Sequence, residues 1–123
     1  MATYRNLDVF NRTYKLSLEI HKFSLTLPKE LQYDLADQIR RASRSIPSNI
    51  AEGYSRNKSI KDKINFLNDA LGSNDEILFN LNFLKDSGLI AIENFEKFRK
   101  EYIICGKQLH QLIESLKTSN LEN

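Results

Sequence analysis

Basic side chains that could contact phosphate groups are concentrated in the second quarter of the chain. Between residues 31 and 61 there are six Lys or Arg residues against three Asp or Glu residues. Arginine forks match the geometry of phosphate oxygens and need no base-specific contact, so this spacing is typical of a surface that binds RNA or DNA. The six residues are Arg40, Arg41, Arg44, Arg56, Lys58 and Lys61.

The same basic residues also have a structural interpretation. Asp37 precedes Arg41 by four residues and Arg40 by three, and these are spacings at which a helix pairs opposite charges. Aromatic side chains for base stacking occur only at the edges of the segment, at Tyr33 and Tyr54, which argues against single-stranded nucleic acid. Two alternatives stay open: a phosphate-binding surface, or a helix face whose arginines make local pairs or subunit contacts.

Residues for catalysis, metal binding or cofactor binding form no recognisable pattern. A di-iron site in a helical bundle needs Glu three residues before His on two helices. Leu18 stands at that position before His21, and Lys107 stands there before His110. The sequence contains no glycine-rich phosphate loop, Gly-x-Ser-x-Gly motif or zinc motif. The single cysteine, Cys105, lies on an apolar stripe and excludes an internal disulfide. We therefore expect a protein without enzymatic activity, metal or cofactor.

Four segments that carry apolar residues at helical spacing predict an all-α protein. Their short connectors predict an antiparallel up-down-up-down four-helix bundle, roughly 30 Å long, in which residues 1–123 form a single domain. Residues 118–123 are expected to fray. The four segments run from about Leu7 to Leu25, from Lys29 to Gly53, from a capping box at Ser59 and Asp62 to a cap at Gly88, and from about Ile92 onward.

The second of these helices contains a proline, which removes a backbone donor and costs about 3 kcal/mol inside a helix. We expect an interruption near Pro47 that leaves the carbonyl of Ser43 without its usual amide partner. Asn49 and Asn74 project onto apolar faces. Because buried amides need partners, these two side chains are expected to pair across the second and third helices.

The first helix has more apolar surface than one small bundle needs. Two apolar stripes lie about 150° apart on it. One begins at Leu7 and Phe10, and we assign it to the core. The other is interpreted as a subunit interface and contains Val9, Leu16, Ile20 and Phe23. Glu76 lies opposite the core face of the third helix, where it either meets a basic residue of a neighbouring subunit or remains in solvent.

The overall composition is that of an ordinary globular domain, with 41% hydrophobic and 28% charged residues. A formal net charge of +2 is too small to indicate nucleic-acid binding by itself. The N-terminal residues lack the apolar run of a signal peptide, and no stretch approaches the length of a membrane span. We expect a cytoplasmic protein.

Ordered motifs along nearly the whole chain resemble the 23S rRNA intervening-sequence family of four-helix bundle proteins. The matching segments are QIRRA at 38–42, SIPSNIAEG at 45–53, FL at 66–67, ALGS at 70–73 with Glu76, LDVF at 7–10 and ICGKQL at 104–109. The resemblance implies a ring-shaped homo-oligomer, because relatives in the family are pentameric. A related branch, the accessory proteins of diversity-generating retroelements, resembles a basic ring that binds nucleic acid and a reverse transcriptase.

These observations together predict a non-enzymatic homo-oligomeric helical bundle that binds RNA or DNA weakly through the basic surface of its second helix. The alternative is a structural or protein-interaction scaffold. The expected partners are further copies of the chain, RNA or DNA, and a reverse transcriptase if the gene is linked to a retroelement; no membrane partner is expected.

Overall fold

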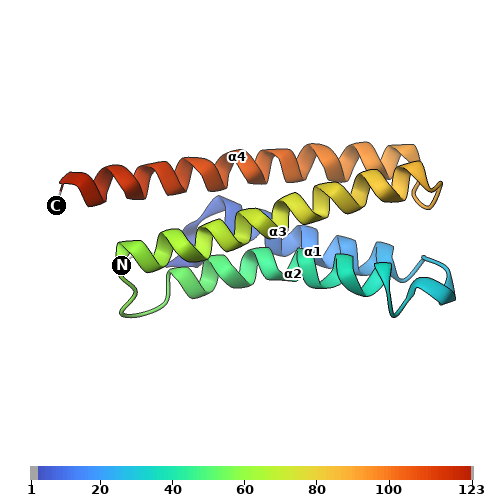
Figure 1. Cartoon of the computed structure of the whole chain (residues 1–123), viewed down its shortest axis with the longest axis horizontal. Coiled ribbons are helices and arrows are strands. Elements are labelled where there is room, and N and C mark those ends of the chain that lie inside the picture. The colour runs from blue at the N-terminus through green and yellow to red at the C-terminus, as the bar shows by residue number, and fades with distance from the viewer. Residues whose placement is uncertain (1–2, 123) are drawn as a thin grey trace.

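Four helices lie side by side in the computed structural model, which describes residues 3–122 (Figure 1). Consecutive helices run in opposite directions, and α1 and α3 each pack against α2 and α4. The part of the chain that the structure describes contains no strand, which confirms the all-α bundle. The helices are α1 (Asp8–Ser24), α2 (Leu35–Gly53), α3 (Ile60–Asp86) and α4 (Ile92–Glu122), with short 3-10 turns η1 (Tyr4–Asn6) and η2 (Lys29–Leu31).

The ends of α3 follow the sequence signals. The Ser59 hydroxyl accepts a bond from the Asp62 amide at 3.0 Å, and the Asp62 carboxylate accepts one from the Ser59 amide at 3.4 Å. At the other end Gly88 has a φ of 72°, and the Leu89 amide donates to the Leu84 carbonyl at 2.9 Å. The predicted capping box and the predicted glycine cap are therefore confirmed.

The other helices differ from their predicted bounds. The chain from Lys29 makes only a 3-10 turn, and α2 begins at Leu35, because Asp34 leaves the helical backbone with φ −128° and ψ −104°. At the far end of the chain, α4 stays helical as far as Glu122 instead of fraying from residue 118, and it extends past the other helices in Figure 1. With 27 and 31 residues, α3 and α4 span about 40 and 46 Å, more than the predicted length.

The proline of α2 does not divide the helix. The helix continues from Leu35 to Gly53 with Pro47 inside it and buried. Pro47 has no amide hydrogen to offer the carbonyl of Ser43, so the interruption consists of one missing backbone donor.

The core lies between the four helices, and the burial of its side chains shows which face of α1 is internal. Val9, Leu16 and Ile20 are 3%, 2% and 1% exposed, and the half-buried Phe23 packs edge-on against Phe98 of α4 at 6.1 Å. The prediction that these four residues form a subunit interface is therefore wrong. In the stripe that was assigned to the core, Leu7 and Phe10 do pack against the core, but the residues from Tyr14 onward face outward instead.

Small hydroxyl residues explain why this face of α1 packs inward. Thr13, Ser17 and Ser24 are buried beside the core stripe. Each donates its hydroxyl to a carbonyl of its own helix, at 2.8, 2.6 and 2.6 Å respectively. Because these hydroxyls are satisfied locally, their burial leaves no polar group without a partner, and their small size lets α1 approach its neighbours.

Buried amides also link the helices differently from the prediction. Asn74 donates to the Tyr102 carbonyl of α4 at 2.9 Å, whereas Asn49 donates to the Ser45 carbonyl of its own helix at 2.9 Å. The expected pairing of the two asparagines across α2 and α3 is therefore wrong. A Cβ atom at Gly106 would lie 3.2 Å from the Asn74 amide nitrogen, so glycine permits this close contact between α3 and α4.

Candidate functional site

Arg40 holds the connection between α1 and α2 together. One guanidinium nitrogen donates to the Ser24 hydroxyl at 2.8 Å and to the Gln32 side-chain oxygen at 3.2 Å, and the other donates to the Gln32 carbonyl at 2.8 Å. The Gln32 amide in turn donates to the carbonyls of Ser24 and Leu27, at 2.9 and 3.0 Å. Arg40 is half-buried and turns both terminal guanidinium nitrogens toward partners within the subunit, so it is a structural residue.

Arg41 and Lys58 each have an acidic partner. Arg41 donates to the Asp37 carboxylate from Nε at 2.9 Å, although 74% of its side chain remains exposed. Lys58 lies 3.7 Å from the Glu52 carboxylate, and its ammonium sits 5.0 Å from the centre of the Phe66 ring. Local pairing thus accounts for both residues.

Arg44, Arg56 and Lys61 are exposed and make no ion pair or side-chain hydrogen bond within the described part of the chain. They do not form one cluster. Arg44 lies nine residues before the end of α2, a separation of about 13 Å along the helix. Arg56 and Lys61 lie beyond that end, in the connection and in the first turn of α3. The structure therefore divides the six predicted basic residues instead of gathering them.

The outward side of α1 carries an unpartnered apolar stripe, here called the α1 face. Tyr14 and Leu18 are each 53% exposed, and Leu25 is 61% exposed. Steps of four and seven residues place the three side chains on one side of the helix. Lys15 and Lys22 are exposed on the same helix, which makes the border of the α1 face basic.

A second apolar surface, the α2–α3 groove, lies on another side of the bundle. Phe79 and Phe83 are 68% and 49% exposed, and Tyr33 is 98% exposed. Two adjoining hollows of about 440 and 460 Å³ share Asp34 and Gln38. Sequence reasoning missed this surface, although both phenylalanines lie off the core stripe of α3. Further lining residues are Leu31, Leu35, Asp37, Arg41, Ala42, Ser45, Ser73, Glu76, Asn80, Ser87 and Leu89.

Glu76 remains an interface candidate because it is exposed and lines this groove. Asp34 is also exposed and lines the same groove, and Asp37 pairs with Arg41. The α2–α3 groove therefore has an acidic border, opposite in sign to the border of the α1 face.

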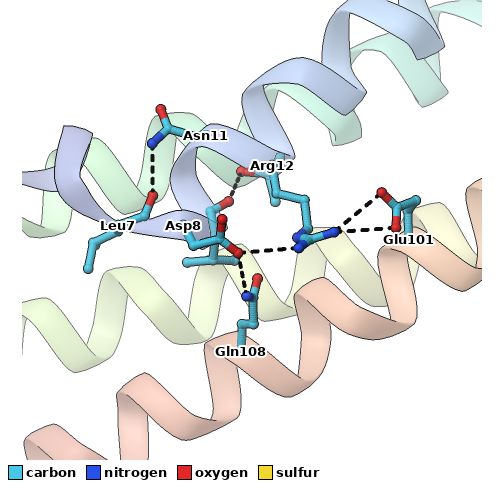
Figure 2. Close-up of polar contacts among 8 residues, drawn as sticks. Leu7, Asp8, Asn11, Arg12, Glu101 and Gln108 are labelled. Carbon is cyan, nitrogen blue, oxygen red and sulfur yellow. Dashed lines mark hydrogen bonds and ion pairs between the residues drawn. The ribbon is translucent and has the colours of Figure 1, made fainter.

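Charged and polar side chains bridge the seam between α1 and α4 (Figure 2). Arg12 lies 3.4 Å from Glu101 of α4 and 3.3 Å from Asp8. Gln108 of α4 donates to the Asp8 carboxylate at 2.7 Å. This hydrogen bond, with the neighbouring Arg12 guanidinium, lowers the pKa of Asp8. The charges here join the two helices and pair with one another.

The buried ionisable groups are not arranged for chemistry. Cys105 is fully buried, and burial raises its pKa to about 12, so the thiol stays protonated at neutral pH. Burial also raises the pKa of Tyr102. His21, predicted on the core stripe, is exposed. No group of three His, Cys, Asp or Glu side chains among the described residues could hold a metal ion. None of the described helices has an apolar stretch long enough to cross a membrane.

Comparisons with known proteins agree with the fold. The chain is similar to the crystal structure of a protein with unknown function from the S23 ribosomal protein family of Bacteroides thetaiotaomicron, with a TM-score of 0.79 and 27% sequence identity over 86% of this chain and 95% of that chain. No curated protein matches the chain. The family model of the 23S rRNA-intervening sequence protein matches residues 5–111. The chain therefore belongs to the 23S rRNA-intervening sequence protein family.

Proposed function

We propose that the protein is a non-enzymatic helical scaffold that assembles with further copies of itself. In this assembly the α1 face of one subunit packs into the α2–α3 groove of the next. The observation that carries the proposal is the pair of unpartnered apolar surfaces on different sides of the bundle. Large exposed apolar patches mark sites of protein association.

The charges that border the two surfaces support contact between them. Lys15 and Lys22 border the α1 face, whereas Asp34 and Glu76 border the α2–α3 groove. Opposite charges around a shared apolar centre favour one orientation and exclude like-with-like pairing. A contact between two different surfaces is head-to-tail, and it forms a ring when the rotation between subunits closes. The pentamer implied by the family resemblance is one such ring.

The test is the mass of the protein in solution, measured by light scattering at micromolar concentration. The wild type should have several times the 14.3 kDa of one chain. Leu18→Glu and Phe79→Glu each place a charge in one of the two surfaces and should reduce the mass to that of a monomer. Gln111→Glu, on the exposed side of α4, is the matched control and should leave the mass unchanged. A monomeric wild type would refute the proposal.

Binding of RNA or DNA through the basic surface of α2 is the second candidate function. It now rests on Arg44, Arg56 and Lys61, because the other three predicted residues have partners within the subunit. If these three residues contact phosphates, replacing them by Gln should weaken nucleic-acid binding at low salt without changing the mass of the assembly.

A further inference from the structure

A hollow between α3 and α4 is lined by basic side chains that belong to neither assembly surface. Its volume is about 640 Å³. Four lining residues are cationic and one, Glu96, is acidic. The cations are Lys85, Arg99, Lys100 and Lys107.

The positive charges of this hollow are free to meet a ligand. All four cations are exposed, and within the described part of the chain none forms an ion pair. The Lys85 ammonium lies 4.8 Å from the centre of the Phe95 ring, a contact that leaves its charge in place. Lys97 of the same helix differs, because it turns toward α1 and pairs with Glu19 at 3.2 Å.

The spacing of the cations suits a linear polyanion. Lys100 and Lys107 are seven residues apart, so they share one side of α4 and lie about 11 Å apart along its axis. That distance corresponds to about three base-pair steps of 3.4 Å along the axis of a nucleic-acid duplex. Several phosphates of one strand could therefore contact the hollow together.

The lining residues favour backbone contacts over base contacts. The aromatic lining residue, Phe95, is only 6% exposed, so it offers no face on which a base could stack. Single-stranded binding proteins depend on such stacking. We propose that this α3–α4 hollow binds the phosphate backbone of double-stranded nucleic acid without reading the bases.

The proposal is independent of self-assembly, because all four cations come from one subunit. The Leu18→Glu variant should therefore bind duplex with the same salt dependence per subunit as the wild type. Assembly would strengthen binding by presenting several such hollows to one duplex. Loss of assembly and loss of duplex binding are thus separately measurable.

The experiment is fluorescence anisotropy with a 20-base-pair duplex of RNA or of DNA, and with the corresponding single strand, between 50 and 200 mM salt. Four phosphate contacts give a slope of log affinity against log salt of about −3.6, a loss on the order of 100-fold over this range. Duplexes of unrelated sequence should bind equally, and the single strand should bind less tightly. The RNA and DNA arms show which duplex is preferred.

A pair of charge-matched double variants locates the site. Lys100→Gln with Lys107→Gln should make the slope shallower by about 1.8. Arg5→Gln with Lys29→Gln removes the same charge from the exposed 3-10 turns η1 and η2, outside the hollow and the α2 surface, and should leave the slope unchanged. Equal effects of the two double variants, tighter binding of the single strand, or no duplex binding by the wild type at 50 mM salt would each overturn the proposal.

Discussion

The contacts of Arg40 lead to a sharp prediction about which arginine is structural. Arg40→Met keeps much of the aliphatic side chain but removes the three hydrogen bonds to Ser24 and Gln32. Each bond from a charged donor contributes about 1.5–3 kcal/mol. Because the site is half-buried, water replaces part of what is lost, so we expect a total loss of about 2–4 kcal/mol. That is a large fraction of the ~5–15 kcal/mol that stabilises a typical domain.

The assay is urea unfolding followed by circular dichroism, with all variants at one protein concentration because assembly adds to apparent stability. Arg44→Met is the matched control, one helical turn away and exposed, and it should change the free energy of unfolding by less than about 0.5 kcal/mol. The reasoning is refuted if the two variants unfold alike and Arg40→Met instead weakens nucleic-acid binding. Arg40 would then be a phosphate ligand.

Two further predictions concern the core. Ile20→Glu buries a carboxylate where the side chain is 1% exposed and should prevent folding. Leu18→Glu, at a site that is 53% exposed, should keep the helical circular dichroism. Equal helicity of the two variants would contradict the assigned orientation of α1. Burial raises the pKa of Cys105 to about 12, so above about pH 9 the unfolded chain loses this proton while the folded chain keeps it. The free energy of unfolding should therefore fall by as much as about 1.4 kcal/mol per pH unit as the pH rises above 9. Cys105→Ala should reduce this slope between pH 9 and 10. An unchanged slope would show that the thiol does not cause the loss of stability.

The bundle was predictable from the sequence because its signals are local. The capping box at Ser59 and the glycine cap at Gly88 depend on residues within a few positions of each other. The orientation of α1 was not predictable from apolarity, since both stripes carry large apolar residues. Buried hydroxyls such as Thr13 decide it, and they count as polar in a sequence pattern.

The roles of the basic residues were predictable only in part, because they depend on contacts between distant segments. Arg40 and Arg44 are the same residue type one turn apart, yet only Arg40 reaches Ser24, 16 positions away. In the sequence, the basic residues of α4 are interspersed with acidic residues, so they do not form an evident basic cluster. Folding turns Glu101 toward Arg12 of α1, while Lys100 and Lys107 line the α3–α4 hollow.

Mixing two assembly-defective variants tests the proposed head-to-tail contact most directly. The Leu18→Glu variant keeps an intact α2–α3 groove, and the Phe79→Glu variant keeps an intact α1 face. Each should be a monomer alone, and an equimolar mixture should form a one-to-one dimer with twice the 14.3 kDa mass of a single chain. A mixture that remains monomeric, although each variant is folded and the wild type is oligomeric, would contradict the proposed contact.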